Sequence, residues 1–540
     1  MAQQQVIILP EGALRTQGRS AQTGNIMAAK AMAEIVRSTL GPRGMDKMLV
    51  DDMGDITITN DGATIVEEMN VEHPAAKMIV EVAKTQDEEV GDGTTTAVVL
   101  TGELLSAAEK LLAKGINTST IVRGYRMAAE KAYVELEKIS KPVKLSDEKV
   151  LKEIAETCMT GKGAEAAKSV VADLCVKAVK QVAEVGEKTV IDLDNIQVEK
   201  KVGGSVSDSE LVLGVVLDKE RANTRMPQKV PKAKIALLDV ALEIKKTETD
   251  AKIEITSPDQ LALFSQQEER TLKDKADAVA KSGATVLFSQ KGIDDLVAHF
   301  LAKAGILAVK SVSKSDMKKL AKATGGKIVS NVADLTSKEL GKAEMVEEVK
   351  IGDDEMIFVR DCKNPKAVSI LVRGGTEHVV DEAKRSVQDA LGGVASAVEL
   401  GKVVSGGGAL EIELAKRIRD YSESVGGREQ LAIQAFAETL EIIPRTLAES
   451  AGMDAIDTLV KLRSEHDKKN VDVGVDVMKA KTSDMWKLGV IEPMKLKLQA
   501  VKSSSEAAEM ILRIDDVIAS SKKHMPPMPP DGGMGGMGGY

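Results

Sequence analysis

The segment Gly91-Asp92-Gly93-Thr94-Thr95-Thr96, followed by the apolar run 97–100, constrains this 540-residue chain more than any other. Two glycines leave the backbone free to approach a ligand, and three hydroxyl side chains then open a predicted helix. The start of a helix presents unpaired N–H groups and the positive end of the helix dipole, so it attracts phosphate. Asp92 stands where a carboxylate could hold the Mg²⁺ that accompanies a nucleotide. The segment therefore predicts a phosphate-binding turn, although the chain contains no Gly-x-x-x-x-Gly-Lys-Ser/Thr motif.

Composition allows large cores and argues against several partners. The chain is 43% hydrophobic but only 2% aromatic, so its cores must be mostly aliphatic, and its length suggests about three or four domains. A net charge of −9 without a basic stripe argues against a nucleic-acid partner. No apolar run approaches the ~20 residues that span a bilayer, and the first residues lack a signal-peptide pattern, so we expect no membrane partner. Three widely spaced cysteines fit the reduced thiols of a cytoplasmic protein, and the scattered histidines lack metal-ligand spacing.

Helical periodicity dominates both ends of the chain. Apolar residues recur with helical spacing over 24–40, 94–113 and from 118 onward, with a predicted strand pair at 47–50 and 56–59. Residues 146–186 are predicted helical and 189–217 are predicted to form short strands. After residue 377 the chain is predicted to be mostly helical again. The segment 525–540, rich in Pro, Gly and Met, cannot bury enough apolar surface, so we expect it to be disordered.

The middle of the chain, about 218–367, alternates predicted strands and helices. The strand candidates are 234–240, 285–289, 306–312, 327–330 and 356–359, and helices are predicted at 292–303 and 315–323. This alternation predicts an α/β domain with a largely parallel sheet.

Residues 247–281 interrupt that alternation, because they are rich in charge and too long for a simple crossover. They end in a predicted helix with Ser257 as N-cap, Pro258 at the first position and Gly283 beyond its C-terminus. Its narrow apolar stripe consists of Leu261, Phe264 and Leu272. Two interpretations are open: a helix that projects from its domain, or a surface helix with an ordinary buried face.

Four further features have little meaning singly. Gly41-Pro42-Arg43-Gly44 is a tight turn after a helix, and Asn60-Asp61-Gly62 is a common turn or helix start. Ser405-Gly406-Gly407-Gly408 fits a close approach to a ligand or a flexible joint. Asp389 is a carboxylate on an otherwise apolar helix, where a partly exposed side chain is the usual situation.

Together, these motifs resemble the chaperonin family. Their order in the chain is Leu-Gly-Pro-Arg-Gly, Asn-Asp-Gly-Ala-Thr-Ile, Gly-Asp-Gly-Thr-Thr-Thr, Thr-Gly-Lys-Gly-Ala-Glu, Gln-Asp-Ala-Leu, Gly-Gly-Gly-Ala and Gly-Val-Ile-Glu-Pro. The resemblance spans about residues 10–522. Gly-Met-Asp-Lys-Met after the first turn, Thr160-Gly161-Lys162-Gly163 and the charged insertion point to the group II branch, since group I members use a separate lid protein. The chain looks most like the archaeal members, and a eukaryotic cytosolic subunit is the nearest alternative.

The resemblance implies a multidomain α+β fold with three nested domains. A mainly helical equatorial ATP-binding domain would take residues 1–144 and 404–522. A small α/β intermediate hinge domain would take 145–215 and 368–403. An α/β apical substrate-binding domain would take 216–367, with a helical lid protrusion at about 245–280, leaving 523–540 as a tail.

The resemblance also implies an ATP site with Mg²⁺. Asp61 and Asp389 would position and activate the attacking water, Lys162 would approach the γ-phosphate, and Asp92 would bind the metal. The other implied contacts are with phosphate, from Gly41, Pro42, Gly44, Gly93, Thr94, Thr95 and Thr96, and with adenosine, from Gly407, Gly408 and Glu492. Phosphoryl transfer needs charge neutralisation and an aligned nucleophile, which this set could supply.

The implied function is an ATP-driven folding chamber. Apical domains would capture non-native polypeptides through apolar surface, and ATP would close the built-in lids over them. Family members form two stacked rings of eight subunits, and paralogous subunits could share the rings. Two alternatives from other classes remain at this point. One is a small metabolic kinase or ATPase that uses the same phosphate turn, and the other is a passive ring that holds clients without hydrolysis.

Overall fold

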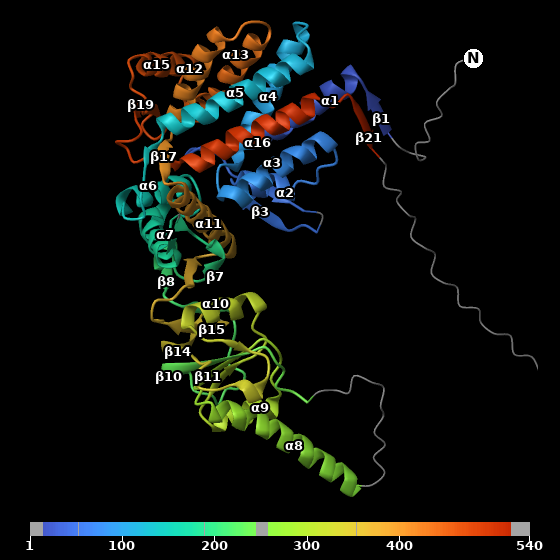
Figure 1. Ribbon diagram of the computed structural model, residues 1–540, viewed down its shortest axis with the longest axis vertical. Coiled ribbons are helices and arrows are strands. Elements are labelled where there is room, and N and C mark those ends of the chain that lie inside the picture. Colours follow the sequence, from blue (N-terminus) through green and yellow to red (C-terminus); the bar gives the residue numbers. More distant parts are fainter. Residues whose placement is uncertain (1–13, 52, 188, 245–257, 353, 520–540) are drawn as a thin grey trace, which may run out of the picture.

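The computed structural model describes residues 14–519, apart from residues 52, 188, 245–257 and 353. The molecule is elongated, with three bodies stacked along its long axis (Figure 1). A helical body at one end contains both the beginning and the end of the described chain, a smaller body follows, and an α/β body lies at the other end. The expected tail 523–540 and the first part of the expected lid protrusion, 245–257, lie outside the described residues.

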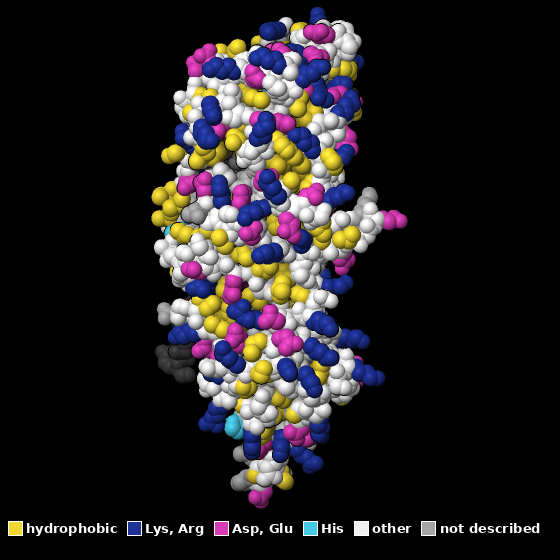
Figure 2. Space-filling model, turned by 90° about the vertical axis from the view of Figure 1, so that its left-hand side faces the viewer, with side chains coloured by type: hydrophobic (Ala, Val, Ile, Leu, Met, Phe, Trp, Pro, Cys, Tyr) yellow, Lys and Arg dark blue, Asp and Glu magenta, His cyan; other side chains and the backbone are white. Residues whose placement is uncertain are grey.

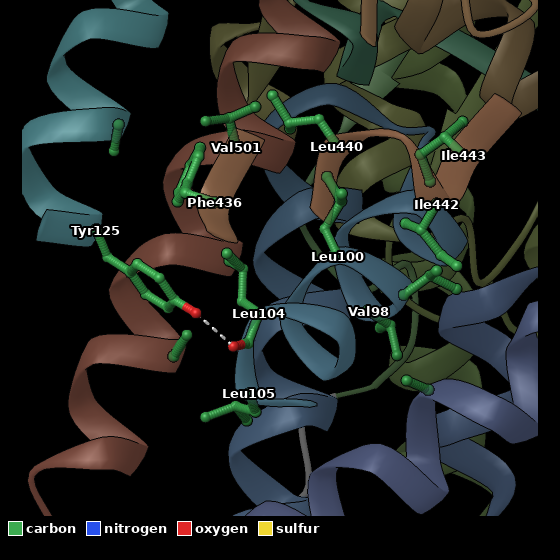
Figure 3. Close-up of a cluster of buried hydrophobic side chains, with 14 of the residues drawn as sticks. Val98, Leu100, Leu104, Leu105, Tyr125, Phe436, Leu440, Ile442, Ile443 and Val501 are labelled. Carbon is green, nitrogen blue, oxygen red and sulfur yellow. Dashed lines mark hydrogen bonds between the residues drawn. The ribbon is translucent and has the colours of Figure 1, made fainter. Parts of the chain in front are cut away.

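The helical body is built around α4, whose apolar side chains face neighbours on nearly all sides. Its helices are α1 (Arg19–Arg37), α2 (Gly62–Glu68), α3 (Pro74–Val90), α4 (Thr94–Ala113), α5 (Thr118–Ile139), α12 (Ala409–Ser424), α13 (Glu429–Leu440), α14 (Ile442–Ser450), α15 (Ala455–Asp467) and α16 (Met494–Leu512). Figure 3 shows Val98 and Leu104 of α4 within the cluster of buried side chains that also contains Phe436. The hydroxyl of Tyr125 donates to the Leu104 carbonyl at 2.7 Å, so the aromatic ring is buried without an unsatisfied polar group.

Two antiparallel strand pairs extend the helical body. β1 (Leu14–Gln17) pairs with β21 (Asp516–Ala519), which brings the two ends of the described chain side by side (Figure 1). β2 (Lys47–Val50) and β3 (Ile56–Thr59) form a hairpin, as expected from the sequence. The hairpin leads into α2, whose N-cap is Asp61.

The smaller body packs three helices against a three-stranded sheet. The helices are α6 (Glu148–Met159), α7 (Lys168–Val182) and α11 (Glu377–Leu400), and the sheet has the order β7 (Ile196–Val202), β16 (Val368–Gly374), β8 (Glu210–Val212), with a small pair β5 (Glu184–Val185) and β6 (Thr189–Val190). A second sheet joins this body to the helical one. It has the order β20 (Ile491–Pro493), β17 (Lys402–Ser405), β4 (Lys141–Pro142).

The α/β body contains a mixed sheet, so the expectation of a largely parallel sheet is wrong. Its strand order is β12 (Leu307–Val309), β11 (Val286–Ser289), β10 (Lys229–Leu238), β14 (Gly341–Ile351), β15 (Asp354–Arg360), β9 (Val215–Leu217), with β13 (Ile328–Val329) also on β10. The pairs β10–β11, β11–β12 and β10–β13 are parallel, whereas β10–β14, β14–β15 and β15–β9 are antiparallel. The helices α9 (Asp295–Lys303) and α10 (Lys314–Thr324) are the crossover connections between the parallel strands β11, β12 and β13.

The longest strand, β14, was not among the predicted strands. Its sequence Gly-Lys-Ala-Glu-Met-Val-Glu-Glu-Val-Lys-Ile alternates buried and more exposed residues over its first half, as in an antiparallel strand with one face toward water, but the acidic Glu348 is buried. The predicted strands were short apolar runs typical of parallel sheets. The prediction therefore found the parallel strands and part of β15, but missed β14 and with it the antiparallel pairing.

The helix α8 (Pro258–Lys281) extends away from the α/β body (Figure 1). Leu263 is 66% exposed, whereas Leu272 and Ala276 in the second half are buried. Gly283 follows the helix with φ +83°, as expected for a residue that ends it. The structure favours the projecting helix over the ordinary surface helix, while the predicted N-cap Ser257 lies outside the described residues.

Charged side chains of both signs are interspersed with scattered apolar ones over the face shown in Figure 2. Within the part of the chain that the structure describes, none of the helices combines the length and apolar character that a bilayer crossing demands.

Candidate nucleotide site

The turn that opens α4 has the backbone geometry expected of a phosphate-binding turn. Gly91 ends α3 with φ +76°, and Gly93 precedes α4 with φ +81°, a region in which residues with side chains are strained. A Cβ atom at Gly93 would also lie 2.8 Å from the end of the Leu496 side chain, which adds crowding to the conformational preference for glycine. Gly93 has no side chain to cap the helix, which leaves the first N–H groups of α4 to a ligand.

A cavity of about 440 Å³ opens beside this turn. Its volume lies in the range of small-molecule sites. Segments that are far apart in sequence meet in its wall, and the predicted residues among them are Gly41, Pro42, Asp61, Asp92, Gly93, Thr94, Thr95, Thr96, Lys162, Gly407, Gly408 and Glu492. Two predicted residues do not line it, namely Gly44 and Asp389. Gly44 closes the preceding turn, because its N–H donates to the Gly41 carbonyl at 2.9 Å.

Lys162 holds two of the predicted carboxylates together. Its Nζ lies 2.6 Å from Asp389 Oδ2 and 3.1 Å from Asp92 Oδ1. Asp61 lies on the other side of the turn and accepts bonds from the Thr64 N–H at 2.8 Å and the Thr94 hydroxyl at 3.2 Å. Three acidic groups and one ammonium group therefore surround the start of α4.

Burial and charge shift the proton affinities in this cluster. Burial raises the pKa of Asp389; the Lys162 ammonium opposes the rise, and the carboxylates of Asp92 and Asp61 add to it, leaving the pKa well above its ordinary value. Burial alone would lower the pKa of Lys162, but Asp389, Asp92 and Asp61 raise it well above its usual range. A carboxylate with an increased proton affinity beside a fixed cation is suited to accept a proton from water.

Asp389 reaches this cluster from α11 in the smaller body. It is only 9% exposed, so the usual partly exposed carboxylate on a helix is not what the structure shows. It lies in the wall of a neighbouring groove of about 860 Å³, which it shares with Asp61. A Cβ atom at Gly392, one turn further along α11, would lie 2.6 Å from the Val90 carbonyl oxygen. α11 can therefore approach the Gly91 turn backbone to backbone, and this approach places Asp389 beside Lys162.

The opposite end of the cavity combines a glycine turn with a buried charge triad. Gly407 and Gly408 have φ +62° and +78° and lead into α12. Lys497 Nζ lies 2.5 Å from Glu492 Oε2 and 2.9 Å from Glu411 Oε1. Burial raises the pKa of Glu492 above its ordinary value; Lys497 opposes the rise, and Glu411 adds to it. This end offers carboxylate hydrogen-bond acceptors from Glu492 to a ligand.

Two buried oxygen atoms in the wall have no hydrogen-bond partner among the described residues. They are Oδ1 of Asn60 and Oδ2 of Asp476, on side chains that are 8% and 7% exposed. A buried acceptor without a partner costs roughly 1–3 kcal/mol, so a ligand with hydroxyl, amino or water donors fits the cavity. Sequence reasoning assigned no role to either residue. Asn60 stood in a recognised turn, but Asp476 at the end of β18 (Val473–Asp476) carried no motif that could have revealed it.

The donor set around Asp92 fits a magnesium ion brought by a nucleotide. The described residues contain no cluster of three or more His, Cys, Asp or Glu side chains arranged for a metal. Mg²⁺ does not need one, since it is commonly held by one or two carboxylates together with phosphate oxygens and water.

Comparisons with known proteins agree with the fold and with this site. A model of the TCP-1/cpn60 chaperonin family matches residues 32–522, and the chain therefore belongs to that family. It is 60% identical to a thermosome subunit of Methanopyrus kandleri over 517 residues, which cover 96% of this chain and 95% of the relative. It is also 60% identical to the thermosome subunit beta of Thermococcus kodakarensis, with coverage of 97% and 96%.

A solved structure described as the open-state monomer of a group II chaperonin from Methanococcoides burtonii is similar, with 45% identity and a TM-score of 0.59. The match covers 79% of this chain and all of that one. The group II assignment, of the archaeal thermosome type, and the multidomain α+β chaperonin fold are thus confirmed. Group II chaperonins are ATP-dependent chaperones that act as double-ring chambers, which is the function expected from the motifs.

Proposed function

We propose that this chain hydrolyses ATP with Mg²⁺ in the 440 Å³ cavity and uses the hydrolysis to close a chamber around non-native polypeptides. The convergence of Asp61, Asp92, Lys162 and Asp389 at the start of α4 carries this proposal. It supports a hydrolytic site over a passive holding ring, because binding alone needs no pair of carboxylates beside the position of the γ-phosphate.

Each residue has a distinct part in the proposed reaction. The N–H groups and hydroxyls of Thr94, Thr95 and Thr96 hold phosphate oxygens at the positive end of α4. Asp92 holds the Mg²⁺, which when bound neutralises charge on the phosphates. Asp61 and Asp389 orient the attacking water, and Asp389 accepts its proton. When Asp389 takes up the proton, Lys162 is free to turn its charge toward the γ-phosphate.

The proposed domains follow the three packed bodies. We assign residues 1–144 and 404–522 to the equatorial domain, 145–215 and 368–403 to the intermediate domain, and 216–367 to the apical domain. Largely separate clusters of buried apolar residues support the assignment; the cluster of the intermediate domain also includes Val143 and Ile491 next to the joint with the equatorial domain. Asp389 lies on the intermediate domain, so hydrolysis would proceed only when that domain is closed onto the turn at Gly91.

Exposed strands support assembly into rings. The β2–β3 hairpin exposes three apolar side chains, Met48 at 65%, Val50 at 63% and Ile56 at 47%. Such exposure is unusual for apolar strand residues unless another subunit covers them. The two-stranded pair β1–β21 likewise leaves its outer edges unpaired in the described chain. One subunit's hairpin could add to this pair in its neighbour, a heterologous contact that closes into a ring. We propose two stacked rings of eight subunits in the cytoplasm, with paralogous subunits possible.

Apolar side chains on the projecting helix support client capture. Leu263 and Phe264 of α8 are exposed on the part that extends beyond the α/β body. They could bind apolar segments of non-native polypeptides, and the projection could then cover the chamber as a lid.

Two measurements on the purified full-length protein test the proposal. Native mass spectrometry with Mg²⁺ and ATP should give a particle near sixteen subunits, and a persistent monomer or dimer would refute the chamber. Phosphate release from ATP should be measurable and should require Mg²⁺. A large ring that releases no phosphate would favour the passive holding ring instead.

A further inference from the structure

The sheet β20–β17–β4 lies where the helical body meets the smaller body. Both chain connections between these bodies pass through it: β4 follows α5, and β17 follows α11. Lys141 of β4 pairs with Val403 of β17, and Val404 pairs with Glu492 of β20. Val403 belongs to the smaller body and Lys141 to the helical one, so a change in the angle between the two bodies acts directly on the β4–β17 pairing and through it on Lys141.

Lys141 makes two contacts outside this sheet. Its Nζ lies 2.8 Å and 3.0 Å from the two carboxylate oxygens of Asp472, and the Ser405 hydroxyl donates to the same carboxylate at 2.6 Å. The ammonium group also lies 3.8 Å from the centre of the Trp486 ring, a cation–π contact. Trp486 is the only tryptophan of the chain.

Asp472 and Trp486 stand at the two ends of one ribbon. Asp472 immediately precedes β18, and Trp486 follows β19 (Lys481–Asp484), its antiparallel partner. The Asp472 carbonyl accepts from the Met485 N–H at 2.8 Å, which closes the base of the ribbon. Lys141 therefore contacts the base of the ribbon both next to β18 and next to β19.

The same ribbon forms one wall of the nucleotide cavity. Its cavity-lining residues are Val475, Asp476, Val477, Met478, Lys479 and Met485. The Val475 N–H donates to the Gly407 carbonyl at 2.8 Å, which ties the ribbon to the adjacent glycine turn. Lys141 is not among the residues that line the cavity.

We infer that Lys141 is a positioning residue, which fixes the position of the ribbon 472–486 according to the angle between the helical body and the smaller body. Lys141 thereby couples nucleotide affinity to the movement of the smaller body. This inference rests on the proposed nucleotide function of the cavity. Coupling of this kind is reciprocal, so a bound nucleotide should favour the joint angle at which Lys141 contacts Asp472 and Trp486. Loss of the contact should weaken nucleotide binding about fivefold, the lower end of measured couplings, since Lys141 itself does not touch the nucleotide.

The experiment compares Lys141→Met with Lys141→Arg in the assembled full-length protein. Affinity for ADP with Mg²⁺ is measured by calorimetry, and the fluorescence emission of Trp486 reports a change in the angle between the two bodies. Lys141→Met should bind about fivefold more weakly and lose the change in Trp486 emission on nucleotide addition, while Lys141→Arg should retain both, since a guanidinium can stack on the ring and pair with the carboxylate. Lys402→Met is the matched control: Lys402 lies on the adjacent strand β17 and pairs with Glu137, away from the ribbon.

The possible results distinguish a failure of the proposed function from a failure of the inference about Lys141. If the wild-type protein does not bind the nucleotide, the proposed function fails and the inference falls with it. If the wild-type protein binds but Lys141→Met has the same affinity and emission response, only the inference is overturned. Equal weakening in Lys141→Met and Lys402→Met would also overturn it, because that result would show a general loosening of the sheet. Unchanged kcat per bound nucleotide with a raised KM in Lys141→Met alone would support a positioning role.

Discussion

Replacement of Lys162 by methionine would remove the only cation in direct contact with Asp92 and Asp389 among the described residues. The three side chains are 17%, 22% and 12% exposed, so water can screen the remaining carboxylates only partly. Removing one partner of a buried ion pair costs about 3–5 kcal/mol, and the partial exposure places this case at the lower end, about 3 kcal/mol. With about 2–4 °C lost per kcal/mol, the unit that contains the site should unfold roughly 6–12 °C lower.

Differential scanning calorimetry of wild type, Lys162→Met and Lys162→Arg measures this effect, with each unfolding transition followed separately because the protein has several bodies. Arginine keeps the charge and should recover much of the loss. Mg²⁺ should raise the unfolding temperature of Lys162→Met more than that of wild type, since the metal at Asp92 replaces the missing positive charge. The reasoning is refuted if Lys162→Met unfolds within about 1 °C of wild type, or if Mg²⁺ stabilises both proteins equally.

Three other changes give separate expectations. Asp389→Ala should reduce phosphate release by about 10²-fold or more while calorimetric ADP affinity stays close to wild type; loss of binding would contradict the role assigned to Asp389. Asp92→Ala should weaken Mg²⁺–ATP binding, and equal affinity in a titration would rule out the metal assignment. Partial burial, followed by the charges of Asp61, Glu67 and Asp92, raises the pKa of Asp87 from 3.8 to about 6, so the folded state binds more protons between these values and stability falls as pH rises through them. Asp87→Asn should remove that fall and increase the free energy of unfolding by about 1 kcal/mol above pH 6, but by little at pH 4. The value is discounted for solvent screening because Asp87 lies at the surface. Urea unfolding at the two pH values tests the sign.

Local patterns predicted local structure well. The helix predicted at 94–113 has these bounds in the structure, because Gly93 precedes it, Gly115 follows it, both with positive φ, and the apolar sequence leaves no competing period. The helix α3 was not predicted, although His73 caps it, Pro74 begins it and Gly91 ends it. Its charged sequence Gln-Asp-Glu-Glu obscured the periodicity just before the most prominent motif of the chain.

Long-range relations were beyond the sequence pattern alone. Strand direction in the mixed sheet depends on which strands meet, and the antiparallel half pairs β10 with a strand about one hundred residues later. The burial of Asp389 depends on Lys162, which is 227 residues away, so statistics for isolated carboxylates favoured exposure. The resemblance to a family supplied the site as a set. It did not supply Asp476, whose unpartnered oxygen becomes visible only when the cavity is closed around it.

The glycines at the contact between α11 and the phosphate turn explain why one movement can control the proposed site. Gly91 and Gly392 approach so closely that a Cβ atom at Gly91 would lie 3.2 Å from the Gly392 Cα. Gly393 packs in the same way against Cys158 of α6, where a Cβ atom would lie 2.6 Å from the sulfur. Asp389 lies one turn before this contact, so any withdrawal of α11 from the Gly91 turn also withdraws the carboxylate from Asp92 and Asp61, which stay with the helical body. A side chain at Gly392 should keep α11 withdrawn, and nucleotide binding without hydrolysis is then the expected result.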